Sequence, residues 1–344
     1  MNNDMIKTNC MINQNIILTG DRPTGSLHLG HYVGSLKSRV ALQHSCKQFI
    51  LIADMQALTD NFERPKFIKN NILQLMAAYM SVELNPDKNI FVLQSAIPEL
   101  AELTIHYMNL VHLGRLQRNP TVKHEIEQKS LENSLSIGFL CYPISQAADI
   151  TAFKANLVPV GQDQVPMIEQ TNEIVRKFNR LYYTNCLKEC KPYLSDVSRL
   201  MGINGAEKAG KSTNNAIFLN ESSKSLKEKV FSMYTDSNHI KISDPGQVEG
   251  NVVFAYLDAF YNNIEHLNEL KQHYKKGGLG DVYLKKLLFD TLENFIAPVR
   301  DKYNQYSNDE LLDILRTGTE IARKVAKNTL SEIRQALCLT NFKF

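Results

Sequence analysis

Two histidines near the start of the chain have the type and spacing to hold a phosphate group. An apolar run at residues 15–19 ends in Gly20, and His28 and His31 follow in a segment with helical spacing. The two imidazoles share one face of the first helical turn, and Gly30 between them leaves room for a nucleotide. The N–H groups and positive dipole end of a new helix attract phosphate, and imidazole N–H groups can bond its oxygens as charge builds. The spacing therefore favours a nucleotide site, with two histidines that only cap a surface helix as the alternative.

A segment late in the chain carries two lysines. Residues 205–212 match, as letters, the P-loop pattern G-x-x-x-x-G-K-[ST]. A P-loop follows directly on a buried strand, but residues 199–204 are too short and too interrupted for one, so a P-loop ATPase is disfavoured. Lys208 and Lys211, next to Ser212, instead offer two mobile ammonium groups that can meet the β- and γ-phosphates as pyrophosphate leaves.

A carboxylate stands in an apolar segment between these two motifs. Asp149 lies within Ala147-Ala148-Asp149-Ile150. A carboxylate in such surroundings can accept a hydrogen bond from a ring N–H and penalise a ring that lacks the donor. The alternative is that Asp149 bonds the neighbouring backbone of its own helix.

Strands and helices alternate in the first half of the chain, and this alternation must position the motifs. Strands are expected at residues 15–19, 48–53 and 89–93, with helices at 29–42 and 66–81 between them. The pattern predicts an α/β fold with a parallel, doubly wound, Rossmann-like sheet. Ligands of such sheets bind at the carboxyl ends of the strands, which is where the two histidines would lie.

The later part of the chain is expected to be mainly helical. A helix at 98–118 ends at Asn119-Pro120, and the polar segment 121–133 is expected to be mobile. The further expected elements are a helix at 145–154, a strand at 157–160, a helix at 164–181, a functional loop at 196–215 and helices beyond residue 223. We predict two domains: an α/β domain at 1–222 with a helical insertion at about 98–140, and an all-helical domain at 223–344.

Composition narrows the class of protein. The 344 residues are 43% hydrophobic and 22% charged, as in soluble globular proteins. The apolar runs are too short for a membrane span, and the polar residues 1–14 do not resemble a signal peptide. Six scattered cysteines are expected to be reduced in a cytoplasm. Cys186 and Cys190 lack further ligands nearby in the sequence, so no metal site is predicted. The net charge of +3 permits a nucleic-acid partner without arguing for one.

The two basic motifs together resemble the landmarks of class I aminoacyl-tRNA synthetases. His28-Leu29-Gly30-His31 stands where that class has its "HIGH" motif, and Lys208-Ala209-Gly210-Lys211-Ser212 resembles its "KMSKS" loop. The loop keeps both lysines and the final serine, while Ala209 and Gly210 replace the usual Met and first Ser. The "HIGH" motif also occurs in some nucleotidyltransferases, so it is the joint pattern that carries the resemblance.

Within that class the chain is similar to bacterial tryptophanyl-tRNA synthetases, from about residue 15 to residue 342. The similarity includes Tyr142-Pro143-Ile144-Ser145-Gln146-Ala147-Ala148-Asp149-Ile150 and Leu157-Val158-Pro159-Val160-Gly161-Gln162-Asp163-Gln164. Gln162 stands where an acid is usual. Gln56 stands where many bacterial relatives have a His, which matches a second bacterial subgroup and leaves the role of Gln56 open.

The resemblance implies a cytoplasmic tryptophan–tRNA ligase that uses ATP with Mg²⁺, takes L-tryptophan and tRNA(Trp), forms a homodimer and reads the anticodon with its helical domain. It implies that the catalytic residues are His28, His31, Lys208 and Lys211. It implies that the ATP-binding residues are Arg22, Pro23, Thr24, Gly30, His31, Gly161, Gln162, Asp163, Leu200, Lys208, Lys211 and Ser212. It implies that the tryptophan-binding residues are Gly20, Gln56, Tyr142, Gln146, Asp149, Ile150, Val158, Val160 and Gln164. Among these, Asp149 would accept the indole N–H.

Three alternative functions remain open. A tyrosine–tRNA ligase would have the same fold, and a phenol could also use an aspartate. A nucleotidyltransferase could use His28 and His31 on another acceptor, although the lysine loop and the helical second half argue against it. A synthetase-like protein that binds tryptophan or RNA for regulation is kept open by the altered lysine loop.

Overall fold

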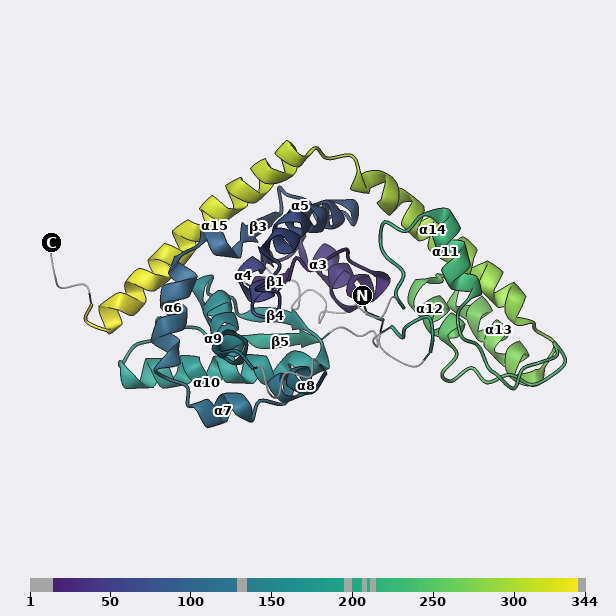
Figure 1. Cartoon of the computed structure of the whole chain (residues 1–344), viewed down its shortest axis with the longest axis horizontal. Helices are drawn as coiled ribbons and strands as arrows, with labels where there is room; N and C mark the ends of the chain where they lie inside the picture. The colour runs from purple at the N-terminus through teal and green to yellow at the C-terminus, as the bar shows by residue number, and fades with distance from the viewer. Residues whose placement is uncertain (1–14, 129–134, 195–199, 206–208, 211–214, 340–344) are drawn as a thin grey trace, which may run out of the picture.

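The structure is a computed structural model, and residues 15–128, 135–194, 200–205, 209–210 and 215–339 of it are described. A sheet flanked by helices forms one part of the molecule, and a group of helices from the second half of the chain lies to one side of it (Figure 1). In the part of the chain described, no helix combines the length and the apolar character needed to cross a membrane.

Five parallel strands form one sheet in the order β3-β2-β1-β4-β5. Their bounds are Ile16–Asp21 (β1), Lys47–Ile52 (β2), Asn89–Leu93 (β3), Leu157–Val160 (β4) and Lys191–Leu194 (β5). The predicted doubly wound α/β sheet is confirmed, and four strands lie where the sequence pattern places them. The pattern does not predict β5, because all its residues are exposed and Pro192 interrupts it, as suits a strand at the edge of a sheet.

Helices cover both faces of the sheet. The longer ones are α3 (Lys37–Leu42), α5 (Pro65–Ser81), α6 (Glu99–Met108), α9 (Ile137–Ala152) and α10 (Val165–Leu181), and the short ones at the strand ends are α4 (Asp54–Leu58), η2 (Gln94–Ala96) and η3 (Gln162–Gln164). In β2, Phe49 and Leu51 join a core with α6, α9 and α10, whereas Ile50 and Ile52 join a core with α5. Successive side chains of a strand point to opposite faces, so a wholly apolar strand requires cover on both sides.

The helices differ from the sequence prediction in several places. Residues 29–42 form α2 (Leu29–His31), a π-helical segment (Tyr32–Leu36) and α3 rather than one regular helix. The helix predicted at 98–118 is two helices, α6 and α7 (Leu113–Gln117). Residues 121–128, predicted to be mobile, belong to α8 (Pro120–Gln128), which Pro120 begins because a first-turn residue needs no backbone N–H. The remaining residues of that segment up to 134 lie outside the described part.

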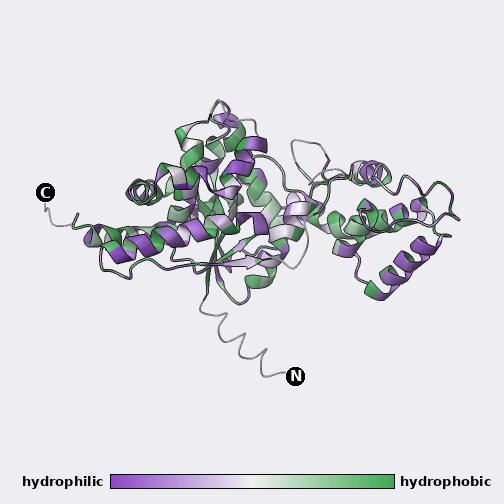
Figure 2. Cartoon of the chain, turned by 90° about the horizontal axis from the view of Figure 1, so that it is seen from below, coloured by the Kyte–Doolittle hydropathy of each residue, from purple (hydrophilic) through white to green (hydrophobic). Residues whose placement is uncertain are grey.

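Helices make up the last third of the chain, as predicted. They are α11 (Ser223–Phe231), α12 (Val252–Phe260), α13 (Ile264–Lys276), α14 (Asp281–Tyr303) and α15 (Asn308–Ala336). Figure 2 shows hydrophobic and hydrophilic residues on opposite sides of the long helices, so each has an apolar side to bury.

The last helix returns to the sheet (Figure 1). The hydroxyl of Thr319 accepts a hydrogen bond from the backbone N–H of Leu93 at 3.0 Å, and a Cβ on Gly318 would lie 2.2 Å from the carbonyl oxygen of Phe91. Helix α15 therefore covers the edge strand β3, which would otherwise offer unpaired backbone groups. Helix α15, which lies in the predicted second domain, thus packs on the sheet of the predicted first domain. The domain boundary at residue 222 stays a prediction.

Candidate active site

The carboxyl ends of four neighbouring strands gather the polar groups of the candidate site. Gly20 lies at the end of β1, Gln56 in α4 after β2, Gln94 in η2 after β3, and Gly161 after β4. A Cβ on Gly20 would lie 2.2 Å from the carbonyl oxygen of Leu51, so only glycine fits between these strands. This is the edge of the sheet where the sequence predicts ligand binding.

His28 and His31 bond each other's backbone at the start of α2. Nδ1 of His28 accepts the N–H of Gly30 at 3.1 Å, and Nδ1 of His31 accepts the N–H of His28 at 3.2 Å. Because each Nδ1 is an acceptor, the proton of each neutral ring is on Nε2, which makes that atom a donor suited to a phosphate oxygen. A Cβ on Gly30 would lie 2.8 Å from Cε1 of His28, so the imidazole itself fills the space that Gly30 leaves.

Ala209, between the two lysines, and the segment after the lysine loop reach this histidine turn. The Cβ of Ala209 lies 3.8 Å from where a Cβ on Gly30 would be. After the loop, the carbonyl of Ile217 accepts the N–H of Leu29 at 2.9 Å, and the next residue forms an antiparallel bridge with His28. The fold thus brings the two motifs together from parts of the chain some 180 residues apart.

The lysines themselves lie outside the described residues. Lys208, Lys211 and Ser212 belong to residues 206–208 and 211–214, so their contacts with phosphate stay a prediction. Leu200, predicted to bind ATP with them, is buried, and its carbonyl accepts the N–H of Ala209 at 3.3 Å.

The turn after β1 is anchored on both sides. Arg22 pairs with Asp60 at 3.2 Å, the N–H of Thr24 bonds the carbonyl of Arg22 at 2.8 Å, and Pro23 is buried. Gly25 has a φ of 109°, a backbone conformation that favours glycine. The turn is therefore held in one shape before α2 begins.

A buried ion pair lies behind the histidines. Arg39, 2% exposed, donates from Nη1 to Asp21 Oδ2 at 2.7 Å, and the hydroxyl of Tyr79 donates to the same oxygen at 2.8 Å. Burial alone would raise the pKa of Asp21. The positive charge of Arg39, the charge that His31 carries when it is protonated, and the two hydrogen bonds lower that pKa to about 2. Asp21 is consequently an anion throughout the neutral range, fixed beneath the turn.

Asp149 lies on α9 and bonds side chains beyond the ends of β2 and β3. Gln94 Nε2 donates to Asp149 Oδ1 at 3.0 Å and to Oδ2 at 2.9 Å, and Gln56 Nε2 donates to Oδ2 at 3.1 Å. Asp149 is 2% exposed, and this burial raises its pKa to about 7. Among the described residues, the carboxylate bonds two side-chain amides and not its own helix backbone, and the side chain of Gln56 points toward Asp149.

The other predicted α9 residues share the face of Asp149. Tyr142, Gln146 and Ile150 are spaced four residues apart, so their side chains follow one side of the helix. Tyr142 and Gln146 are half-buried and Ile150 is buried. Burial, and next the carboxylate of Glu125, raise the pKa of the Tyr142 hydroxyl above its usual value.

The turn after β4 holds the remaining predicted residues. Val158 is buried and Val160 half-buried in β4. Gly161 precedes η3, in which Gln162 and Asp163 are exposed and Gln164 is half-buried and bonds Asp163 Oδ2 at 3.3 Å. Exposed polar side chains at a strand end suit a polar part of a ligand such as a ribose.

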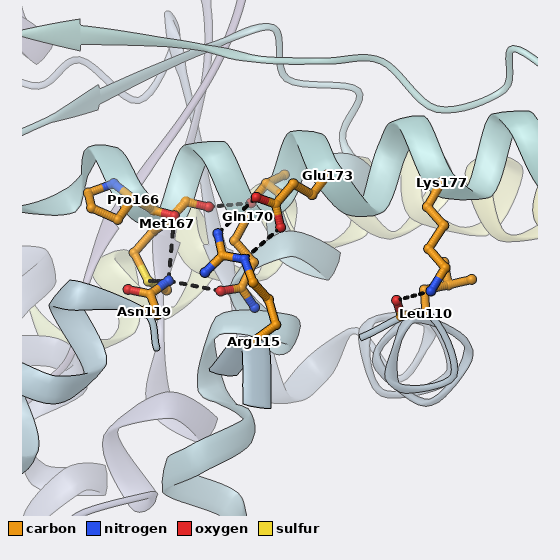
Figure 3. A network of polar contacts seen from close by, with 9 residues as sticks. Leu110, Arg115, Asn119, Pro166, Met167, Gln170, Glu173 and Lys177 are labelled. Carbon is orange, nitrogen blue, oxygen red and sulfur yellow. Dashed lines mark hydrogen bonds and ion pairs between the residues drawn. The ribbon is translucent and has the colours of Figure 1, made fainter. Parts of the chain in front are cut away.

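A polar network ties this turn to α7 and α8, and Figure 3 shows the part of it that joins Asn119 and Arg115 to α10. The hydroxyl of Thr121, in α8, donates to the carbonyl of Asp163 at 2.6 Å. Asn119, wholly buried, accepts the N–H of Thr121 at 3.0 Å and donates to Gln170 Oε1 at 2.8 Å. Figure 3 also shows Arg115 paired with Glu173 in α10, at 2.8 Å. The position of the turn after β4 therefore depends on α7 and α8 as well as on the sheet.

Comparisons with known proteins show the family to which the chain belongs. Residues 12–297 match the profile of a family described as "tRNA synthetases class I (W and Y)". The chain belongs to this family. Among class I synthetases, the tryptophan–tRNA ligase of Clostridium longisporum is 54% identical over 333 residues, 95% of this chain and 98% of that protein. The enzyme of the same name from Streptococcus mutans is 54% identical over 336 residues, 95% of this chain and 99% of that protein.

A solved structure of a class I synthetase has the same fold over almost the whole length. The crystal structure of tryptophanyl-tRNA synthetase from Campylobacter jejuni, complexed with ADP and tryptophan, matches with a TM-score of 0.82 and 31% sequence identity. The match covers 94% of this chain and 100% of that one.

The sequence does not predict three residues of the candidate site, Gln94, Thr121 and Arg39. Gln94 follows a predicted strand, and that position was its only signal. Thr121 stands in a segment predicted to be mobile, and Arg39 reads in the sequence as a surface residue of a helix. Among the described residues, no group of three or more His, Cys, Asp or Glu side chains is placed to hold a metal.

Proposed function

We infer that the protein is a tryptophan–tRNA ligase, which activates L-tryptophan with ATP and transfers it to tRNA. Its family and its relatives, 54% identical over 95% of the chain and named for this activity, support the inference. The structural observation that carries it is Asp149, a carboxylate 2% exposed that two amides hold at the end of the sheet where substrates bind. Such a group suits the ring N–H of tryptophan. A ring without a donor would leave an acceptor position of the buried carboxylate without a hydrogen bond, which costs free energy.

The first chemical step forms tryptophanyl-adenylate. An oxygen of the tryptophan carboxylate attacks the α-phosphorus of ATP, a new P–O bond forms, and the bond to the β-phosphate breaks to release pyrophosphate. The carboxylate is already ionised, so positioning and charge stabilisation are what the protein must supply. The Nε2–H groups of His28 and His31 donate hydrogen bonds to the phosphates, and Lys208 and Lys211 stabilise the negative charge of the departing pyrophosphate.

The second step transfers tryptophan to tRNA. The 2′-hydroxyl oxygen of the terminal adenosine attacks the carbonyl carbon of the adenylate, a C–O bond forms and the hydroxyl proton is released to solvent. The bond from that carbon to the phosphate oxygen breaks, and AMP leaves with its electrons. In this proposal Gly161, Gln162 and Asp163 receive the ATP ribose, and Tyr142, Gln146 and Gln164 receive the tryptophan ammonium group. The remaining site residues keep the assignments that the family resemblance implies.

The proposal also covers the metal ion, the recognition of tRNA, the oligomeric state and the cellular compartment. Mg²⁺ would arrive with ATP, since it is usually held by substrate phosphates and water rather than by a protein cage. The helical domain predicted at 223–344 would read the anticodon, the enzyme would work as a homodimer, and it would act in the cytoplasm.

Charging of tRNA tests this function directly. Purified protein, ATP, bacterial tRNA and labelled tryptophan should yield acid-precipitable tryptophanyl-tRNA, and labelled tyrosine should yield almost none. Steady ATP hydrolysis without amino acid or tRNA is not expected. If tyrosine were charged instead, the substrate would be wrong. If neither were charged while tryptophan bound, the regulatory alternative would replace the ligase.

A further inference from the structure

Asp149, the acceptor of the proposed tryptophan site, is held by neighbours on two other elements. Asp149 lies on α9, whereas Gln56 and Gln94 lie in α4 and η2, after different strands of the sheet. Three hydrogen bonds reach the carboxylate: one from Gln94 to Oδ1, one from Gln94 to Oδ2 and one from Gln56 to Oδ2.

These bonds leave limited capacity on the carboxylate. An ionised carboxylate has about four acceptor positions, two on each oxygen. The contacts described use both positions on Oδ2 and one on Oδ1 of Asp149. One acceptor position, on Oδ1, therefore remains for a substrate.

Gln94 is itself firmly placed. Its side chain is 1% exposed, and its Oε1 accepts the backbone N–H of Gln56 at 3.1 Å. The carboxylate of Asp54 joins the same two segments, because its Oδ1 accepts the N–H groups of Met55 at 3.1 Å and Ser95 at 2.9 Å. A buried amide with its donors and acceptor engaged has few other orientations available.

We propose that Gln94 is a positioning residue for amino-acid specificity: its amide donates hydrogen bonds to both oxygens of Asp149, and these bonds orient the remaining acceptor position of Oδ1 toward the ring N–H of the substrate. This rests on the proposed tryptophan–tRNA ligase function. Gln94 acts through Asp149 and touches no reacting atom. A site built around one directed acceptor rejects a ring without a donor far more strongly than a loosely held carboxylate does.

Charge supports this role. Burial raises the pKa of Asp149 to about 7, the hydrogen bond from Gln94 lowers it, and the neighbouring carboxylate of Asp54 raises it. Asp54 belongs to α4, which reaches α9 through the bond of Gln56 to Asp149, and Tyr107 belongs to α6, which packs on α9, where its hydroxyl bonds Thr151 at 2.8 Å. Removing the amide of Gln94 should therefore raise the pKa of Asp149 further, so that less of it is ionised at neutral pH.

Gln94→Leu is the first test, since leucine has a similar size and no amide. Pyrophosphate exchange is measured with tryptophan and with β-(3-benzothienyl)alanine, which has sulfur in place of the ring N–H. The wild type should strongly prefer tryptophan, and Gln94→Leu should lower the ratio of the two kcat/KM values at least about tenfold. In the background of Asp149→Asn, the same change should alter the ratio by less than about twofold, because both residues act through one group.

Gln43→Leu is the matched control. Gln43 is also buried and also makes three hydrogen bonds, to Glu83, Asn85 and Asn89, but it lies near the amino end of β3, away from the site. This variant should keep the wild-type ratio even if it loses comparable thermal stability.

A pH series gives a second readout that a purely structural role would not change. The kcat/KM for tryptophan, measured from about pH 6 to about pH 8.5, should rise at a higher pH in Gln94→Leu than in the wild type or Gln43→Leu. If Gln94→Leu does not fold, Gln94→Glu keeps the shape and places a second carboxylate against Asp149, which should move the profile in the same direction.

The outcomes separate this inference from the proposed function. A wild-type enzyme that does not activate tryptophan contradicts the function. A wild-type enzyme that prefers tryptophan, combined with a Gln94 variant that keeps both its ratio and its pH profile, or with additive effects of the Gln94 and Asp149 changes, overturns the role of Gln94 alone.

Discussion

At the scale of single residues, a few side-chain atoms decide what the site can bind. Nδ1 of His28 and Nδ1 of His31 both accept backbone N–H groups, which assigns the proton of each neutral ring to Nε2. Asp149 is an acceptor that is 2% exposed and that the side-chain amides of Gln56 and Gln94 bond. The Nε2–H groups of the two histidines suit phosphate oxygens, and the carboxylate of Asp149 suits a ring N–H.

The use of tryptophan should depend on the ionisation of Asp149. Burial raises the pKa of this carboxyl to about 7, so its ionised form is lost as the pH falls through that value. A protonated Asp149 is a poorer acceptor, and we expect the KM for tryptophan to rise as the pH is lowered from about 8 to about 6, with the KM for ATP changing less. In Asp149→Asn this pH dependence should disappear, and roughly 2 kcal/mol of discrimination for the ring N–H should be lost. An unchanged pH profile in Asp149→Asn would show that another group titrates.

At the scale of elements, the sequence predicts most of what places the site. Strands β1 to β3 are apolar runs with one hydrophobic core on each face, so composition alone marks them. Strand β5 and helix α8 were not predicted, because β5 is exposed along its whole length and α8 is polar, with only Thr121 and Val122 buried. Their positions come from tertiary contacts, which no local pattern records. Gln94 was not predicted for the same reason, because its hydrogen-bond partners lie 38 and 55 residues away in the chain.

The contact between α8 and the turn after β4 should matter for ATP rather than for tryptophan. Thr121→Val removes the hydroxyl that bonds the carbonyl of Asp163 at 2.6 Å and keeps the shape of the side chain. We expect the KM for ATP to rise about tenfold, the scale of one lost hydrogen bond, with the KM for tryptophan nearly unchanged. Thr121→Ser should restore the wild-type value.

Thr104→Val is the control for that change, because the hydroxyl of Thr104 bonds Leu100 within α6 at 2.7 Å. Thr104→Val should leave the KM for ATP and the KM for tryptophan unchanged. Equal increases in the two KM values for Thr121→Val would indicate general loosening of the fold and not a role at the nucleotide end.

At the scale of the whole molecule, the chain closes the site with segments far apart in sequence. Ile217 and Phe218 pair with the histidine turn, Ala209 approaches Gly30, and α15 comes back to cover β3. The resemblance to class I synthetases implied that the two motifs act on the same nucleotide, whereas the return of α15 to the sheet was not predicted, since an amphipathic helix does not record what its apolar face contacts.

The lysine loop should act only as pyrophosphate leaves. Lys211→Ala should lower the single-turnover rate of adenylate formation at least about 100-fold, roughly 2.7 kcal/mol, with a much smaller change in ATP affinity. Transfer from preformed adenylate to tRNA should be largely spared. The chain contains no tryptophan, so the fluorescence of bound tryptophan can follow the reaction. Adenylate formation at the wild-type rate would show that this loop is not catalytic.

Amino-acid-dependent pyrophosphate exchange, run separately with each of the twenty amino acids, tests the central claim most directly. It reports the first chemical step alone and needs no knowledge of the tRNA. If Asp149 selects a ring N–H within a class I synthetase site, exchange should be fast with tryptophan and weak with the other nineteen, tyrosine included. Faster exchange with tyrosine, or equal exchange with several amino acids, would contradict the account.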